Sequence, residues 1–332
     1  MLRTGPLTLA FGPPRYEALA MATGHFWTLW PHIGAVLAPP TPPPSRHFRT
    51  EAPDPARGTI RLTGRFSSPP GARTLVLLVH GLGGSAASSY MMLAARAAHD
   101  AGMATLRLNL RGADRSGEDY YHAGLTSDLK AALGSAEARP YERVFVWGFS
   151  LGGHVTLRLM TEDHDPRLAG AVAVCTPIDL AGAARAFDEP RRVVYRRYVL
   201  GGLKEIYREV YLRRGGPVAL PGAMAIDTLE EWDNRIIAPR HGFADADDYW
   251  EKVGVGPRLG FVDRPTLVVQ AEADPMIPMH TVRPTLDAAP NVDTRWIPRP
   301  GGGHVGFPKD LDLGVDAPKG LEAQVMGWMA RA

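Results

Sequence analysis

The chain has 332 residues, of which 45% are apolar and 22% charged, and its formal net charge is +2. These values are typical of a globular protein with one large α/β domain or two small ones, and they argue against nucleic acid as a partner. Because Cys175 is the only cysteine, an internal disulfide and a site of paired cysteines are both excluded.

The first residues bear on where the protein works. Met1 to Ala10 carry one arginine and a short apolar stretch broken by Pro6, without a clear cleavage site, so they make a poor signal peptide. No apolar run reaches the length that spans a bilayer. We therefore expect a cytoplasmic protein without stable membrane insertion, which at most contacts a membrane surface transiently.

Residues 1–57 are rich in proline and are predicted to form an arm packed on the core. Five prolines crowd residues 39–44. Because proline disrupts helix interiors and inner strands, the arm is expected to be extended rather than helical. Its aromatic segment, residues 24–31, either docks the arm on the core, which we favour, or contacts a membrane surface.

Strand and helix patterns then alternate over residues 58–175 and again over residues 264–332. The predicted strands are 59–66 at an edge, 74–79, 104–110, a run that begins at Val144, 169–175, 265–271 and 292–297. The predicted helices are 89–99, 126–136 and 319–330. This alternation predicts an α/β core with a mostly parallel, twisted sheet and helices on both faces.

Between residues 176 and 263 the alternation stops, and the sequence is helical, aromatic and rich in arginine. We predict that this segment is an inserted helical cap. It would cover the active site, because such sheets place the site at the carboxyl ends of their strands. Three motifs follow predicted strand ends: His80 to Ser85, Asn109 to Gly112, and Ser150.

Ser150 is the centre of a G-x-S-x-G sequence, which runs from Gly148 to Gly152. An apolar strand precedes it and a helical pattern follows, and this context gives the motif its meaning as a nucleophile elbow. The two glycines leave room where neighbouring backbone passes close. The unpaired N–H groups of the new helix lie where an oxyanion would develop, so we predict that Ser150 is a nucleophile.

A serine nucleophile needs a histidine to take its proton and a carboxylate to orient that histidine. In enzymes with this elbow the chain order is serine, acid, histidine. Asp274 stands in the turn after a late strand and is preferred to Glu272, which adjoins the strand end. His304 follows three glycines after the last strand and is preferred to His280, which falls where a helix is expected.

The oxyanion hole of this class uses two backbone N–H groups. Here they belong to Leu82 and Leu151, and each donor contributes ~3 kcal/mol to lowering the barrier. His80 is expected to support the loop that carries Leu82. Since the sequence contains no dinucleotide or phosphate-loop glycine pattern and no H-E-x-x-H pattern, we expect neither a cofactor nor a metal.

Taken together, these stretches resemble the YheT-like branch of the α/β-hydrolase fold, which includes bacterial esterases, medium-chain acyl esterase/acyltransferases and lipid hydrolases. The matching stretches are Gly24 to Pro31, His80 to Ser85, Asn109 to Gly112, Tyr121 to Gly124, Gly148 to Gly153, Trp232-Asp233, His241 to Phe243, Tyr249-Trp250, Asp274 to Met276, and Gly302 to Phe307. The resemblance implies a serine hydrolase that uses Ser150, Asp274 and His304. Phe149, His154, Ala123 and Gly301 depart from the residues usual there.

We therefore expect a carboxylic ester hydrolase that acts on short- to medium-chain acyl esters through an acyl-enzyme on Ser150. Its substrate would be a small-molecule or lipid-like ester. Acyl transfer to an alcohol with the same three residues is an alternative. A non-catalytic binding protein on a hydrolase scaffold is a further one, which the intact set of catalytic residues disfavours.

Overall fold

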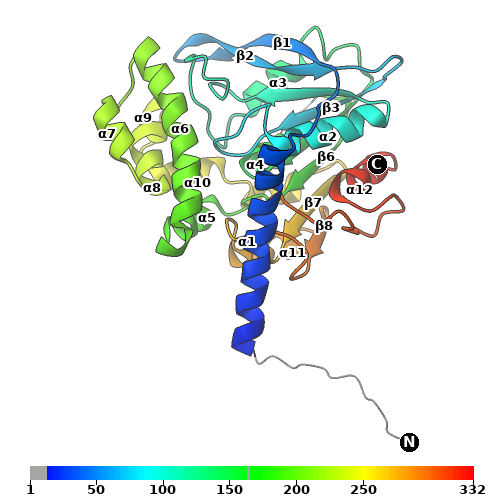
Figure 1. The fold of residues 1–332 in the computed structure, drawn as a ribbon. Helices are drawn as coiled ribbons and strands as arrows, with labels where there is room; N and C mark the ends of the chain where they lie inside the picture. Colours follow the sequence, from blue (N-terminus) through cyan, green and yellow to red (C-terminus); the bar gives the residue numbers. More distant parts are fainter. Residues whose placement is uncertain (1–12, 163–164) are drawn as a thin grey trace, which may run out of the picture.

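An eight-stranded sheet forms the centre of the computed structural model, which describes residues 13–162 and 165–332 (Figure 1). The strands are β1 (Arg46–Asp54), β2 (Gly58–Ser67), β3 (Thr74–Val79), β4 (Ala104–Asn109), β5 (Arg143–Phe149), β6 (Leu168–Val174), β7 (Thr266–Ala271) and β8 (Asp293–Ile297). They lie in the order β1-β2-β4-β3-β5-β6-β7-β8, and only β1–β2 and β2–β4 pair antiparallel. The predicted mostly parallel sheet is confirmed, whereas the expectation for Met1 to Ala10 lies outside the described residues.

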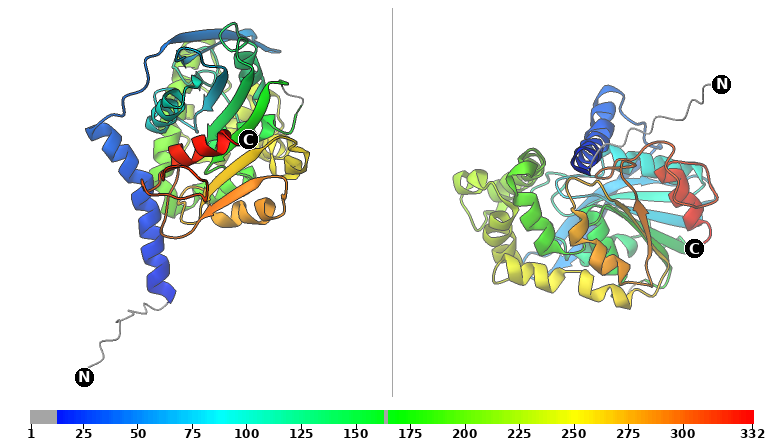
Figure 2. Two further views of the ribbon diagram at one scale, coloured as in Figure 1. Left: turned by 90° about the vertical axis from the view of Figure 1, so that its right-hand side faces the viewer. Right: turned by 90° about the horizontal axis from the view of Figure 1, so that it is seen from below.

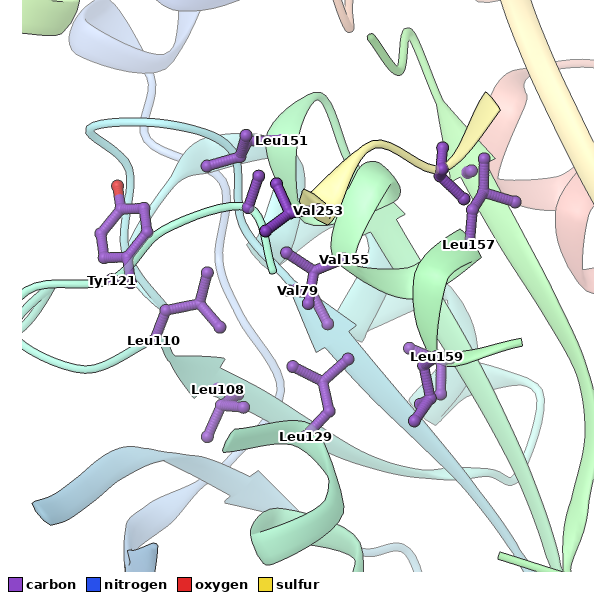
Figure 3. Close-up of a cluster of buried hydrophobic side chains, with 14 of the residues drawn as sticks. Val79, Leu108, Leu110, Tyr121, Leu129, Leu151, Val155, Leu157, Leu159 and Val253 are labelled. Atoms are coloured by element: carbon purple, nitrogen blue, oxygen red, sulfur yellow. The ribbon is translucent and has the colours of Figure 1, made fainter. Parts of the chain in front are cut away.

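Both faces of the sheet are buried. Along β3, Leu77 and Val79 point to one side and Leu78 to the other, as alternate residues of a strand do. The helices α3 (Thr126–Leu133) and α4 (Leu151–Leu159) cover the first side, and α2 (Ser89–Asp100) and α12 (Leu321–Met329) cover the second. Figure 3 shows leucine and valine side chains of β3, β4, α3 and α4 converging on the first side. Each large apolar side chain buried in this way stabilises the fold by ~1.5–3 kcal/mol.

The N-terminal region differs from the prediction. Instead of an extended arm, it contains the helix α1 (Pro13–Leu37) and the strand β1. Pro13 and Pro14 stand in the first turn of α1, where proline is tolerated, and the crowded prolines begin only after the helix has ended. Pro31 lies inside α1 and leaves the carbonyl of Trp27 without its helical partner. The backbone of Gly306 packs against that carbonyl.

Strand β1 also corrects the prediction for residues 59–66. That segment was expected at the edge of the sheet, but it forms β2, which pairs with β1 from Asp54↔Gly58 to Arg46↔Phe66. The outermost strand is β1, and it contains Pro53. Proline is tolerated there because an edge strand has N–H positions without a ladder partner. The proline content of the region argued against a strand, but a strand that contains proline can form at the edge of a sheet, and β1 lies there.

The chain between β6 and β7 is helical, as predicted, and lies to one side of the sheet (Figure 1). Its elements are α5 (Leu180–Asp188), η1 (Pro190–Arg192), α6 (Val193–Arg214), α7 (Leu220–Ala225), α8 (Leu229–Trp232), the π-helix η2 (Asp233–Ile237), α9 (Ala238–His241), α10 (Ala246–Val253) and η3 (Gly256–Phe261). Two short helices, η4 (Met279–Thr281) and α11 (Arg283–Asp287), follow β7. The division into a core of residues 58–175 and 264–332 and a cap of residues 176–263 remains our proposal.

Helix α1 begins beyond the edge of the rest of the molecule, and its second half runs along the body toward α2 (Figures 1 and 2). None of the helices in the described part of the chain is both long enough and apolar enough to cross a membrane. The position of α1 matters for the site, because the helix lies directly against the loop that carries His304.

Candidate active site

Ser150 occupies a sharp turn between β5 and α4. Its φ is +51°, a left-handed conformation that a residue other than glycine adopts only where the surrounding structure imposes it. A Cβ on Gly148 would collide with Gly152 O and Thr156 Oγ1, and one on Gly152 would collide with the carbonyl of Val79. Both glycines of the motif are therefore required by close packing, and together they hold the serine in its strained turn.

The turn is also fixed from the neighbouring strand. Ser150 N–H donates to Val174 O of β6 at 2.8 Å, and Ser150 O accepts from Gly153 N–H at 2.9 Å. The Ser150 side chain reaches a cavity of about 1820 Å³, which His304, Leu82 and Leu151 also line. The structure thus brings four of the five predicted site residues to one cavity.

Two backbone N–H groups beside Ser150 have no acceptor among the hydrogen bonds of the described residues, those of Leu82 and Leu151. On either side of Leu82, Gly81 N–H donates to Tyr90 Oη at 3.1 Å and Gly83 N–H donates to Tyr121 Oη at 2.7 Å. The two tyrosines hold the loop while the N–H between them stays available. An available donor in this position is what an oxyanion hole requires.

This loop lies close to the nucleophile. A Cβ on Gly81 would stand 3.0 Å from Ser150 Cβ. His80 holds this loop in place, because its Nδ1 donates to Gly81 O at 2.8 Å and its Nε2 accepts from Leu110 N–H at 3.1 Å. Burial lowers the pKa of His80 to about 4. With both ring nitrogens engaged and the ring neutral, His80 has the supporting role that the sequence indicates.

Asp274 and His304 are paired at the carboxyl end of the sheet. His304 Nδ1 donates to Asp274 Oδ2 at 2.9 Å, and Asp274 Oδ1 accepts from the N–H groups of Met276 and Ile277 at 2.8 and 3.0 Å. A proton held on Nδ1 leaves Nε2 as the basic nitrogen, and His304 lines the cavity. The Asp274 carboxylate therefore accepts from three donors, with Oδ1 held by the backbone and Oδ2 bonded to the histidine.

The two competing residues of the sequence analysis lie elsewhere. Glu272 accepts from Arg283 at 2.6 Å, and His280 is an exposed residue of η4. Neither lines the cavity. The structure therefore pairs the preferred aspartate with the preferred histidine and gives the competing carboxylate a different partner.

Helix α1 supports the His304 loop, which the sequence did not indicate. His304 N–H donates to Thr28 Oγ1 at 2.8 Å, and Thr28 Oγ1 in turn donates to Gly24 O at 2.7 Å. Side chains on Gly303 and Gly306 would collide with the backbone of α1. Through these contacts the Gly24 and Thr28 face of the aromatic segment packs on the core, and its one threonine lies next to the candidate base. In the sequence, the aromatic segment was the one feature that could have indicated this contact.

The cavity wall is formed largely by the helical segment between β6 and β7. It includes Phe187, Tyr195, Val199, Leu203, Trp232, Tyr249 and Trp250. Asp233, at the start of the π-helix η2, also lines this wall and accepts from Trp250 Nε1–H at 2.8 Å. Burial raises the pKa of Asp233 to about 7. The wall is therefore apolar and aromatic, with one carboxyl group that titrates near neutrality.

The helical segment between β6 and β7 is bonded to the loop that carries Asp274 and to α1. Arg192 of η1 is only 5% exposed and donates from Nε to Pro275 O at 2.8 Å. Tyr195 Oη lies 2.6 Å from His25 Nδ1 of α1. His154, which departs from the family pattern, is buried with Nδ1 2.8 Å from Pro177 O and Nε2 3.1 Å from Val253 O.

One group of potential metal ligands exists in the described part of the chain, and it is Cys175, Asp274 and His304. Burial raises the pKa of the Cys175 thiol well above its usual range, so the thiolate that a metal requires is disfavoured. The Cys175 Sγ donates to Gly303 O at 3.4 Å, and both Asp274 oxygens already accept hydrogen bonds. The chemistry of this set fits a hydrogen-bonded acid and base better than an ion.

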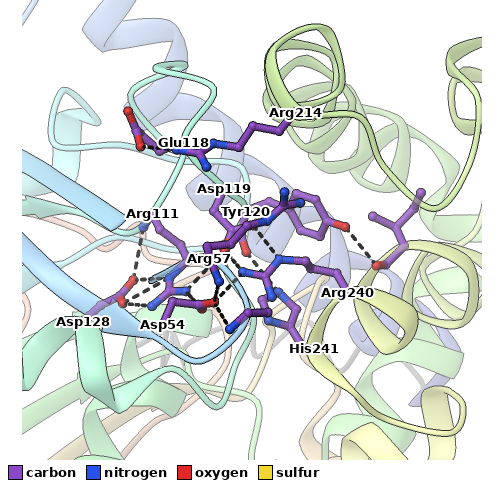
Figure 4. A network of polar contacts seen from close by, with 12 residues as sticks. Asp54, Arg57, Arg111, Glu118, Asp119, Tyr120, Asp128, Arg214, Arg240 and His241 are labelled. Carbon is purple, nitrogen blue, oxygen red and sulfur yellow. Dashed lines mark hydrogen bonds and ion pairs between the residues drawn. The ribbon is translucent and has the colours of Figure 1, made fainter. Parts of the chain in front are cut away.

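The motif Asn109 to Gly112 follows a strand end, as the candidate catalytic motifs do, but its side chains form hydrogen bonds that stabilise the fold. Asn109 Oδ1 accepts from Ala86 N–H at 2.7 Å. Arg111 is 1% exposed and donates to Asp54 at 2.6 Å and to Asp119 at 3.3 Å, and it is paired with Asp128 as well (Figure 4). This arginine joins the end of β1, the loop after β4 and helix α3. Its partners leave no atom for substrate.

The chain matches the family model described as Alpha/beta hydrolase family over residues 76–313, and it belongs to that family. Among the curated relatives, the candidate esterase YheT of Escherichia coli (strain K12) is 31% identical over 246 residues, which are 70% of each chain. Within the family the chain is accordingly a YheT-like relative, an α/β hydrolase of the esterase and lipase type.

Two more distant proteins are also similar to this chain. A monoacylglycerol lipase of Saccharomyces cerevisiae is 23% identical over 72% of this chain and 56% of its own. The solved structure of the α/β hydrolase GrgF from Penicillium sp. sh18 superposes with a TM-score of 0.52 at 18% identity, and it covers 79% of this chain and 91% of that one. At this identity the structural likeness shows the fold alone.

Proposed function

We propose that the protein is a serine carboxylic ester hydrolase acting on short- to medium-chain acyl esters. One observation carries the proposal. Ser150 is held in a strained elbow between two N–H groups without acceptors, and it shares a cavity with a histidine whose Nδ1 is bonded to a carboxylate. The names of the relatives, an esterase candidate and a lipase, support ester substrates.

In the proposed reaction, Ser150 Oγ attacks the acyl carbon and its proton passes to His304 Nε2. The carbonyl oxygen gains negative charge and accepts from the N–H groups of Leu82 and Leu151. The C–O bond then breaks as His304 returns the proton to the leaving alcohol, and the acyl group stays on Ser150. Water, deprotonated by His304, attacks the acyl-enzyme and releases the acid and Ser150. Asp274 stays ionised throughout and holds Nδ1–H.

The test combines labelling with turnover. A fluorophosphonate, which reacts with activated serines, should label Ser150 in the folded protein and block hydrolysis of an aryl ester. Peptide mapping identifies the modified residue. A protein that is folded yet neither labelled nor active would contradict the proposal and favour a binding protein. Products measured in the presence of an added alcohol distinguish the free acid expected here from the new ester of an acyltransferase.

A further inference from the structure

The large apolar side chains that remain exposed are concentrated around the cavity. The structure describes eleven of them, and eight lie on α1 or line the cavity. These eight are Phe26, Leu29, Trp30, Ile33, Leu37, Leu93, Val194 and Tyr198. The other three, Leu212, Met224 and Phe261, are scattered over the helical segment after β6. Single exposed apolar residues are ordinary, but a contiguous group marks a surface that meets another apolar phase.

Five of the eight form one stripe on α1. Phe26, Leu29, Trp30, Ile33 and Leu37 are 43–79% exposed, and their spacing of three, one, three and four residues keeps them within one face of a helix. The opposite face packs on the His304 loop through Gly24 and Thr28. The helix thus has a docked face and an apolar face that faces outward, and the Phe26 and Trp30 rings stack at 5.5 Å on the outward face.

The stripe continues into the rim of the cavity. Leu29 and Trp30 of α1, Leu93 of α2, and Val194 and Tyr198 of α6 are exposed and also line the cavity. Three elements that are far apart in the sequence therefore contribute exposed apolar side chains to the edge of the cavity, which exposed Arg65 and Lys309 also line. An apolar substrate that enters past these side chains meets the outward face of α1 on the way.

The charge pattern of α1 points in the same direction. Residues 18–45 contain no aspartate, glutamate, lysine or arginine. The helix has Arg15 and Glu17 near its start, and the part that carries the exposed tryptophan and phenylalanine has no charged side chain. Such a segment suits the boundary between water and acyl chains, where aromatic rings are favoured. Attraction there comes from apolar burial and not from anionic headgroups, so a zwitterionic lipid suffices.

We propose that the outward face of α1 and the rim of the cavity form a docking surface for a lipid–water interface. A second copy of the chain seated on the same residues would close the opening, whereas a lipid surface would supply acyl chains to it. The delivery of substrate from that surface rests on the proposed ester hydrolysis. The docking itself does not, because it depends on the outward-facing side chains alone.

The experiment measures binding of the full chain to phosphatidylcholine vesicles by flotation. The variant is Phe26→Ser with Leu37→Ser, two stripe residues that do not line the cavity. Its control is Phe261→Ser with Leu212→Ser, which removes the same two residue types at 71% and 69% exposure away from the stripe. Each side chain is expected to contribute roughly fivefold to partitioning, so the stripe variant should bind ~25-fold more weakly and the control should bind like the wild type.

Two further measurements complete the design. Ser150→Ala should bind vesicles like the wild type, so that a failure of docking is separated from a failure of the proposed chemistry. The stripe variant should turn over a short water-soluble ester at the wild-type rate and lose rate only on an ester embedded in vesicles. The proposal would be overturned if the wild type did not bind vesicles, or if the stripe and control variants lost binding equally. It would also be overturned if the wild type formed a dimer that only the stripe variant abolished.

Discussion

Two buried clusters in the described part of the chain combine the same residue types, an aspartate and a basic group, and they differ in which polar atoms remain without a hydrogen-bond partner. Around Arg111, three aspartates and Arg240 use their polar atoms on one another. Around His304, the aspartate is fully used, but the histidine keeps Nε2 toward a cavity. Burial and charge pairing are common to both clusters. A candidate catalytic site differs from a structural network in having a polar atom that faces a cavity and has no hydrogen-bond partner.

The electrostatics follow the same division. Burial alone would raise the pKa of Asp54, but its hydrogen bond from Arg111 and the charge of Arg240 lower it to about 2. Such a network holds its charges fixed over the whole range in which enzymes work. It joins β1, the loop after β4, α3 and α9 (Figure 4), and so ties the helical segment after β6 to the sheet.

The largest expected effect is on the site. Ser150→Ala should lower kcat/KM for a simple aryl ester by ~10⁴-fold or more, because the nucleophile is lost. The thermal unfolding transition should not move by more than a degree or two, since a Cβ remains in the elbow. The check is turnover by purified protein with a matching circular dichroism spectrum. Substantial activity in a folded variant would remove Ser150 from the mechanism.

The next effect tests the choice of carboxylate. Asp274→Asn keeps the shape but favours the wrong tautomer of His304, so turnover should fall by ~10³- to 10⁴-fold. Glu272→Gln is the matched control, because Glu272 bonds to Arg283 and not to the histidine, and it should change turnover by less than about threefold. Equal losses, or the reverse order, would show that the acid was assigned wrongly.

The structural network should respond in stability and not in chemistry. Asp128→Asn removes one charge beside Arg111, both 0–1% exposed, and should lower the free energy of unfolding by about 3–5 kcal/mol. Glu142→Gln is the control, because its pair with Arg73 is 61% and 76% exposed and contributes about 0–1 kcal/mol. Urea denaturation measures both. A turnover loss in folded Asp128→Asn as large as that of Asp274→Asn would erase the contrast between the clusters.

Asp233 provides a prediction of pH dependence. Its pKa is about 7 in the folded protein, against 3.8 for an aspartate in water, so the folded state holds a proton that the unfolded state has lost between these values. Unfolding free energy attributable to this group must therefore fall as pH rises from about 4 to about 7. Asp233→Asn should remove that fall. The difference in unfolding free energy between variant and wild type should therefore favour the variant more at pH 8 than at pH 5. Exposed Asp227→Asn is the control, and a gain of equal size there would refute the assignment.

How far the sequence predicts this molecule depends on how local each feature is. The elbow, the acid turn and the histidine loop are short motifs at strand ends, and the order of serine, acid and histidine was enough to choose among the candidates. Helix α1 could not be predicted in this way. Its prolines disfavour a helix locally, and it is held by Thr28, Gly303 and Gly306, which lie far apart in the chain. The roles of the Tyr90 and Tyr121 hydroxyls could not be predicted either, because their partners, Gly81 and Gly83, belong to a loop elsewhere in the sequence.

The smallest expected effect concerns the apolar wall of the cavity, which we propose holds the acyl chain and not the reacting atoms. Each buried methylene contributes up to ~0.8 kcal/mol, or about fourfold, so kcat/KM should rise from acetyl to medium-chain esters and fall once the wall is reached. Leu203→Phe narrows the cavity from α6 and should move the maximum to a shorter chain, whereas Leu212→Phe, which is exposed on the same helix, should not. The measurement is a matched series of aryl esters below their aggregation limits, with Ser150→Ala as the background. A steady fall from acetyl onward would mean that the aromatic wall serves packing and leaves only a small acyl site.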